Sequence, residues 1–351
     1  MSLLQTTLAA IREPDAAAAA EARRKIDLKT KPLGSLGRLE EVACAVAGIR
    51  RAAAPEMPVK AMVVMAGDHG VAAEGVSAFP QEVTAQMVLN FAQGGAAINV
   101  LSRQVGARLL VVDVGVKGDL PALPGVRSAR VAKGTRNFAE GPAMTRDEAV
   151  QALEVGIAVA EELIRDGVTL IGLGEMGIAN STPAVALTAA WTGRPVAALT
   201  GRGTGIDDAT LAHKVSVIER ALRVNAGATD PIDVLARLGG LEIAGLAGVV
   251  LGAAARSVPV LTDGVIATAG ALAAARICPA AAGAILASHS SVEVGHRVQL
   301  EALGKRALFD FDLRLGEGTG AALAMAFVDA SVRILREMAS FEDAGVSTQE
   351  R

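Results

Sequence analysis

The chain has 351 residues, of which 51% are hydrophobic, 2% are aromatic and 20% are charged, and its formal net charge at pH 7 is -3. This length allows one large α/β domain, alone or with a smaller helical one. The weak net charge and the absence of a basic run exclude an obvious nucleic-acid or membrane surface, so we expect small-molecule substrates.

The cysteine content and the N-terminal segment indicate the compartment. Cys44 and Cys278 are isolated, which is typical of a reducing environment without disulfides. Charges from Arg12 onward interrupt the N-terminal segment, so we expect no signal peptide. The apolar stretches 243–255 and 264–275 are shorter than the roughly 20 residues that a membrane helix needs. The sequence therefore predicts a cytoplasmic protein.

Residues 1–54 carry helical patterns and few strand signals, and Pro55 and Pro58 end this region. We expect a helical lobe there. At the other end of the chain, an apolar and largely helical segment follows Gly320 and runs to a polar tail. We expect this final helix to return to the N-terminal lobe.

From Val59 onward, short β-branched runs alternate with helical segments, which is typical of βαβ units and a parallel sheet. We expect strands at residues 60–65, 108–112, 168–173, 196–199, 258–261, 282–287 and 306–311. Glycine, acidic or hydroxyl residues follow these runs. Because open α/β sheets bind ligands beyond the carboxyl ends of their strands, this recurrence predicts one active-site cleft. Residues 119–142 are rich in Pro and Gly, and we expect an excursion over the surface, a candidate lid.

Residues 307–320 form the stretch in which we expect the chemistry. Alternating apolar residues are followed by Gly316-Glu317-Gly318 and then by an apolar helix. The glycines allow backbone and ligand to approach closely, and the start of the helix offers free N–H groups to an anion. Glu317 is therefore a candidate catalytic carboxylate. The alternative is a tight strand-to-helix turn with a solvated Glu.

The segment from Gly172 to Gly177 matches the dinucleotide pattern G-x-G-x-x-G after a predicted strand. A nicotinamide-binding unit also needs an acid about 20 residues on, and the next predicted strand ends in Thr200-Gly201-Arg202 instead. Glu175 would also place a carboxylate where a pyrophosphate lies. We therefore prefer a nucleotide site without a dinucleotide, and an NAD-dependent oxidoreductase is the alternative function. A catalytically silent nucleotide-binding protein is a second alternative.

Two further segments suit a phosphate group. Gly201 to Gly205 resembles an anion-binding turn, and Lys214 on the following helix is placed to reach back to a phosphate, unless it is a solvated helix lysine. His289, Glu293 and His296 have spacings at which a metal can be imagined. We prefer a hydroxyl-rich phosphate loop at Ser288 to Ser291, and we predict neither a metal nor a cofactor.

Taken together, these motifs resemble those of the nicotinate-nucleotide:dimethylbenzimidazole phosphoribosyltransferase family, over nearly the whole chain. The resemblance is carried by residues 31–40, 67–71, 75–81, 174–180 and 314–320. It implies transfer of 5-phosphoribose from nicotinate mononucleotide to 5,6-dimethylbenzimidazole, which gives α-ribazole 5'-phosphate and nicotinate and serves cobalamin lower-ligand synthesis. It also implies a homodimer and a Rossmann-like parallel sheet with helices on both faces. Residues 59–320 would form this large domain, and residues 1–58 and 321–351 a small helical domain.

The resemblance also implies roles for individual residues. By position, Glu317 corresponds to the family's proton acceptor. The other assignments depend on loop position. For the base we expect Ser77, Phe79, Gln86, Met176 and Leu315. For the nucleotide we expect Gly174, Glu175, Gly177, Gly203, Lys214 and Ser291.

Overall fold

The computed structural model describes residues 1–203 and 205–347. Within these residues, six parallel strands form one sheet in the order β3-β2-β1-β4-β5-β6. The strands are β1 Lys60–Gly67, β2 Arg108–Gly115, β3 Val126–Ser128, β4 Leu170–Met176, β5 Val260–Thr262 and β6 Ile285–Ala287. This order is that of doubly wound dinucleotide-binding folds, and the predicted Rossmann-like α/β fold class is confirmed.

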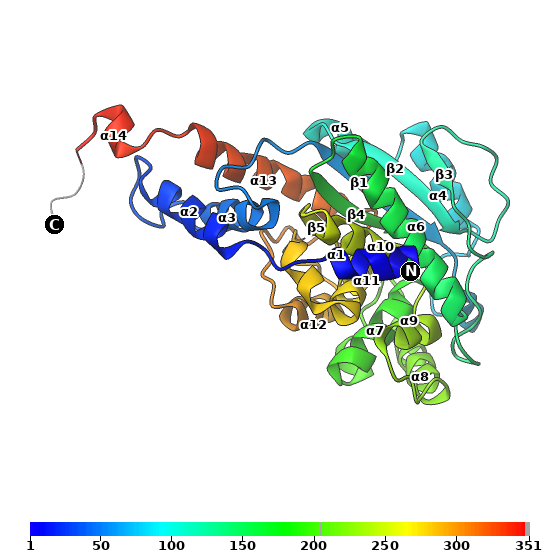
Figure 1. Ribbon diagram of the computed structural model, residues 1–351. Coiled ribbons are helices and arrows are strands. Elements are labelled where there is room, and N and C mark those ends of the chain that lie inside the picture. The colour runs from blue at the N-terminus through cyan, green and yellow to red at the C-terminus, as the bar shows by residue number, and fades with distance from the viewer. Residues whose placement is uncertain (204, 348–351) are drawn as a thin grey trace.

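Helices connect the strands and extend from both ends of the sheet (Figure 1). The α-helices are α1 Leu3–Ala10, α2 Ala16–Asp27, α3 Arg38–Arg50, α4 Val83–Gln93, α5 Ala97–Val105, α6 Arg146–Arg165, α7 Ser181–Thr192, α8 Asp208–Val224, α9 Pro231–Leu238, α10 Leu241–Ala255, α11 Val265–Ile277, α12 Val294–Leu303, α13 Thr319–Glu337 and α14 Phe341–Ala344. Short 3₁₀ helices are η1 Gly70–Glu74, η2 Val196–Ala198 and η3 Pro279–Ala284.

Both faces of the central strand β1 are buried, which explains why its sequence is continuously apolar. Ala61, Val63 and Met65 pack into the same core cluster as α6, α10 and α11. Met62 and Val64 point to the opposite face, where α4, α5 and α13 cover the sheet. Figure 1 shows the sheet between these two layers of helices.

The long helix α13 links the sheet to a helical extension. Its first half covers the sheet, and its second half lies beside α2 and α3, where Leu335 packs with Ile26 and Ala43 (Figure 1). Helix α1, by contrast, packs on α6 and α10, and the Leu4 N–H donates to Glu154. The division into domains 1–58 with 321–351 and 59–320 stays a prediction.

The neighbouring strands β1 and β4 mark the topological switch point of the sheet, where successive connections run in opposite directions. Met65 pairs with Glu175, and Ala66 pairs with Met176, so the two strands end side by side. In open α/β sheets a crevice opens at this point, beyond the carboxyl ends of the strands. The fold therefore places the loops after β1 and β4 together.

Two of the seven expected strands are wrong. Residues 196–198 form η2, because Pro195 starts a helical turn and the buried Val196 and Leu199 have helical rather than alternating spacing. Residues 306–311 extend beside residues 288–290 through a single parallel bridge between His289 and Phe309, and are not a strand of the sheet. The other five expected strands are found, with ends that differ by a few residues.

The segment 119–142 also differs from the expected surface excursion. It contains the edge strand β3, which pairs with β2, and Phe138 is fully buried. The Thr135 N–H donates to the carbonyl of Asp68, so the segment is anchored at the end of β1. None of the helices in the described part of the chain is both long and apolar enough to cross a membrane.

Candidate active site

A cavity of about 450 Å³ lies at the carboxyl ends of the strands. It is lined by ten of the expected site residues, namely Ser77, Phe79, Glu175, Met176, Gly177, Gly203, Lys214, Ser291, Leu315 and Glu317. Two expected residues are not part of its lining. Gly174 lies behind it within β4, and Gln86 is on an exposed position of α4, whose buried face carries Thr84, Val88 and Phe91. The cavity thus joins loops from distant parts of the sequence.

A second hollow of about 570 Å³ is lined by Arg136, Arg146 and Arg237, away from this cavity. These arginines pair with Glu148, Asp230 and Asp233, respectively. Because their charges are already matched by acids, this hollow is a weaker candidate for binding an anionic ligand than the strand-end cavity.

Glu317 has an unusual backbone conformation. Its φ is +61°, and the flanking Gly316 and Gly318 have φ of +84° and +96°. A left-handed conformation costs a residue with a side chain about 1–2 kcal/mol, so the surrounding contacts must hold it. The Glu317 carboxylate accepts the N–H of Ile98 at 3.1 Å, in the first turn of α5, and the residue is only 7% exposed. Burial raises the pKa of Glu317, and the negative charge of Asp263 adds to this effect, which suits a general base.

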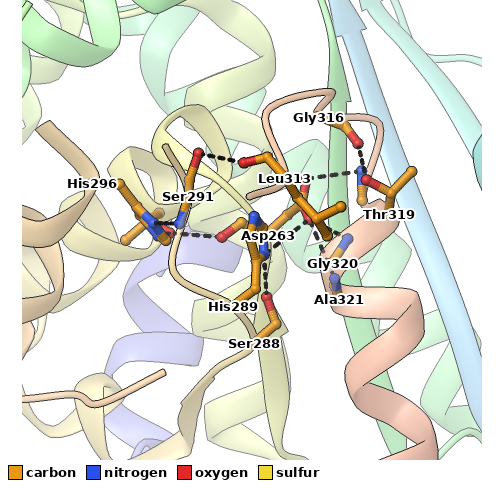
Figure 2. Close-up of polar contacts among 12 residues, drawn as sticks. Asp263, Ser288, His289, Ser291, His296, Leu313, Gly316, Thr319, Gly320 and Ala321 are labelled. Atoms are coloured by element: carbon orange, nitrogen blue, oxygen red, sulfur yellow. Dashed lines mark hydrogen bonds and ion pairs between the residues drawn. The ribbon is translucent and has the colours of Figure 1, made fainter. Parts of the chain in front are cut away.

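Asp263, directly after β5, fixes the start of α13. Its Oδ1 accepts the N–H groups of Gly320 at 2.7 Å and Ala321 at 3.2 Å, and its Oδ2 accepts the N–H of Gly318 at 3.1 Å (Figure 2). These bonds satisfy N–H groups that a helix start leaves free. In the sequence, Asp263 is one of the acidic residues that follow the predicted strands, and no local pattern indicates its role, because its partners lie more than 50 residues away.

Glu175, at the end of β4, contacts residues 313–318, which we call the catalytic segment. Its carboxyl group accepts hydrogen bonds from the side-chain amide of Asn180 and from the backbone N–H of Glu317. Burial raises the pKa of Glu175 to about 8, and the charges of Asp263 and Glu242 act in the same direction. A β-carbon on Gly316 would overlap the Glu175 carboxyl group, so the glycine is needed for this close approach.

Lys214 also lines the cavity. Its Nζ donates to Ser181 Oγ at 2.8 Å, at the start of α7, and the side chain is buried rather than solvated. Glu293 accepts the N–H of Gly203 at 3.0 Å beside this pair. Burial lowers the pKa of Lys214 to about 8, and Glu293 opposes the shift. A cation next to a helix N-terminus and a glycine N–H is suited to a phosphate group.

Apolar side chains are also part of the cavity lining. Phe79, Met176 and Leu315 are placed there, together with Val76 and Met87. Ser77 adds a hydroxyl group, which accepts the Phe79 N–H at 3.3 Å. Together these side chains suit a flat aromatic ring with one polar edge.

His289, in the loop after β6, lines the cavity, and His296, in the first turn of α12, has its ring centroid 5.8 Å from that of His289; both residues are buried. His289 Nδ1 lies 3.1 Å from Ser288 Oγ and 3.8 Å from Asp263 Oδ1 (Figure 2). Burial lowers the pKa of His289, and the Asp263 charge opposes this shift. Among residues 1–203 and 205–347, no group of three or more His, Cys, Asp or Glu side chains is arranged to hold a metal ion.

Comparisons with known proteins point to one family. A family model described as "Phosphoribosyltransferase" matches residues 11–346. The nicotinate-nucleotide–dimethylbenzimidazole phosphoribosyltransferase of Geobacter sulfurreducens is 57% identical over 348 residues, which are 99% of both chains. The enzyme of that name from Chloroflexus aggregans is 58% identical, again over 99% of both chains. A crystal structure of CobT from Thermus thermophilus has a TM-score of 0.92 and 48% identity, and the match covers 95% of this chain and 100% of that chain.

These relatives are named for pentosyl transfer, so the alternative of an NAD-dependent oxidoreductase is wrong. The structure gives the physical reason why the G-x-G-x-x-G pattern misleads. Gly172 and Gly174 lie inside β4 instead of a loop after it. A β-carbon at Gly172 would overlap Met62, and one at Gly174 would overlap the Glu317 carbonyl, so these glycines make room for packing.

Proposed function

This chain belongs to the nicotinate-nucleotide–dimethylbenzimidazole phosphoribosyltransferase family, and we propose that its strand-end cavity is where that reaction takes place. The enzyme moves 5-phosphoribose from nicotinate mononucleotide to 5,6-dimethylbenzimidazole and releases nicotinate. The product is α-ribazole 5'-phosphate, a precursor of the cobalamin lower ligand. The observation that carries the assignment of the site is the buried Glu317 carboxylate, which lines the cavity beside apolar side chains.

The proposed chemistry requires one proton acceptor. One benzimidazole nitrogen attacks the anomeric carbon of the nucleotide, while the bond from that carbon to the pyridinium nitrogen breaks and its electrons neutralise the departing nicotinate ring. The other benzimidazole nitrogen then gives its proton to Glu317. Attack opposite the departing ring converts the β-nucleotide into an α-product. The raised pKa of Glu317 brings this carboxylate closer to the basicity that a proton acceptor near neutral pH needs.

Two groups of lining residues match the two substrates. We assign the phosphate to Gly203, Lys214 and Ser291, because the buried Nζ of Lys214 contacts Ser181 at the start of α7. We assign the base to Ser77, Phe79, Met176 and Leu315. Glu175, near the end of β4, and Gly177, directly after that strand, also line the cavity. The position of Gln86 outside the lining does not support its assignment to the base.

Replacing Glu317 with Gln tests this proposal. The variant Glu317→Gln keeps the size of the side chain but cannot accept the proton, so we expect kcat to fall by roughly 10²- to 10⁴-fold. The measurement is nicotinate release from nicotinate mononucleotide with dimethylbenzimidazole present, and mass spectrometry identifies the ribosylated base.

The matched control is Glu337→Gln, at the far end of the same helix that follows the catalytic segment. Glu337 is exposed and forms an ion pair with Arg333 one helical turn away, so this change should leave turnover unaltered. If the turnover of Glu317→Gln were close to that of the control, Glu317 would not be the proton acceptor.

We also propose a homodimer in the cytoplasm. Val292, Val294, Phe311 and Leu315 each expose half or more of their surface, in the two neighbouring segments that carry Ser291 and Glu317. Adjacent exposed apolar side chains are typical of a protein–protein contact. The two isolated cysteines support a reducing compartment.

A further inference from the structure

The segment that carries Glu317 is tethered at both ends. At its C-terminal end, the Gly318 N–H donates to Asp263. At its N-terminal end, the Leu313 carbonyl accepts hydrogen bonds from Ser291 Oγ and from the Val292 N–H, each at 3.2 Å. Residues 314–317 lie between these two points, so the loop after β6 helps to determine where the Glu317 carboxylate is placed.

The Ser291 loop is in turn held by His296. The Ser291 N–H donates to His296 Nδ1 at 3.0 Å, so this ring nitrogen carries no proton. The ring proton must then lie on Nε2, which is 3.0 Å from Thr268 Oγ1. The Thr268 hydroxyl donates onward to the Asp263 carbonyl at 3.4 Å. Only the neutral imidazole makes both contacts, and burial lowers the pKa of His296 to about 3, with the neighbouring His289 acting in the same direction.

Together with the backbone of residues 313–318, these hydrogen bonds form a closed ring that returns from Asp263 to His296 through Thr268. Figure 2 shows His296, Ser291, Leu313 and Asp263 in this arrangement. Asp263 holds one end of the catalytic segment directly. His296 holds the other end through Ser291. We infer that His296 is a positioning residue for the transferase reaction. By accepting the Ser291 N–H, it fixes the loop after β6, which in turn holds the catalytic segment at Leu313.

His296 is suited neither to proton transfer with the substrates nor to metal binding. The residue is 1% exposed and does not belong to the cavity lining, so it does not touch the reacting atoms. Both of its ring nitrogens are engaged by protein groups, so neither offers a free lone pair to a metal ion. A purely structural histidine would affect the stability of the protein, but not the placement of Glu317.

Two amide variants separate the two contacts of the ring. In His296→Asn, the amide oxygen is as many bonds from the backbone as Nδ1, so it is able to accept the Ser291 N–H. In His296→Gln, the amide nitrogen is as many bonds away as Nε2, so it reaches Thr268 while the Ser291 contact is lost. Both variants remove the ring, and both should therefore have similar melting temperatures.

The inference depends on the proposed site and predicts different kinetics for the two variants. We expect kcat/KM for nicotinate mononucleotide to be at least about tenfold higher in His296→Asn than in His296→Gln, because small displacements of a catalytic group are costly. A smaller ratio, at matched melting temperatures, would overturn the inference. Failure of the wild type to release nicotinate in the same assay would instead overturn the proposed function.

A measurement on the wild-type protein keeps the inference testable if the variants do not fold. Nitrogen-15 NMR of the histidine rings reports which nitrogen carries the proton. We expect the His296 proton on Nε2, because Nδ1 accepts the Ser291 N–H. A proton on Nδ1 would contradict this hydrogen bond and the role assigned to His296.

Discussion

At the scale of single residues, the chemistry depends on ionisable side chains whose pKa values are shifted by burial. Glu317, Glu175 and Asp263 are three carboxyl groups in one small region, each nearly buried. Burial raises the pKa of Glu317 and of Glu175, the latter to about 8, whereas it lowers the pKa of Lys214 to about 8. The charge state of the site should therefore change within an accessible range of pH.

This charge change predicts a loss of activity at alkaline pH. Lys214 is protonated below about pH 8 and loses its charge as the pH rises through that value, so its attraction for the phosphate should weaken. We expect kcat/KM for nicotinate mononucleotide, which reports the free enzyme, to fall above about pH 8. In Lys214→Arg the fall should disappear, because guanidinium stays protonated.

Glu175 titrates near the same pH and provides the comparison. Its carboxyl group is protonated below about pH 8 and becomes charged above it. If the alkaline fall persists in Lys214→Arg but is absent in Glu175→Gln, the carboxyl group rather than the lysine is responsible. That outcome would contradict the assignment of the phosphate to Lys214.

Part of this site can be predicted from the sequence, and the rest cannot. Glu317 was recognisable because two glycines flank it next to a predicted helix. The roles of Asp263 and His296 were not recognisable, since each acts through hydrogen bonds to backbone groups. The Asp263 carboxylate caps a helix more than 50 residues further along the chain. Such contacts leave no local pattern in the sequence.

At the scale of secondary structure, runs of apolar residues predicted the buried parallel strands but did not identify every short element. β1 and β2 are eight residues long and apolar nearly throughout, so their assignment was clear. Residues 196–199 are equally apolar but too short for periodicity to separate a strand from a helical turn. β3 is three residues long and lies in a segment rich in Pro and Gly, which explains why it was missed.

The close packing of β4 against the catalytic segment gives a prediction for a glycine. A β-carbon at Gly174 would overlap the Glu317 carbonyl oxygen, so Gly174→Ala should displace the segment and lower kcat by roughly 10²-fold. Steady-state kinetics of nicotinate release measures this effect. The matched control is Gly141→Ala, because a β-carbon there would meet open space and its backbone is not left-handed. Equal kcat values for the two variants would show that β4 does not constrain the position of Glu317.

At the scale of the whole molecule, α13 connects the active site to the helices at the N-terminal end of the chain. Its first turn is held by Asp263 next to Glu317, and its later turns pack against α2 and α3 (Figure 1). Lys60 at the start of β1 also pairs with Asp329 in the middle of α13. A change in the position of this helix would therefore be transmitted to the catalytic segment.

The last prediction concerns assembly of the whole molecule. The apolar side chains of Val292, Val294, Phe311 and Leu315 border the cavity on two hydrogen-bonded segments, and Phe311 is 61% exposed. Covering them in a homodimer would remove this apolar surface from water. We expect light scattering to give twice the chain mass of 35.6 kDa for the wild type, and a shift toward the monomer for Phe311→Lys. Val59→Lys is the control, because Val59 is also exposed but precedes β1, at the opposite end of the sheet. A monomeric wild type, or equal masses for the two variants, would show that these side chains are not the dimer contact.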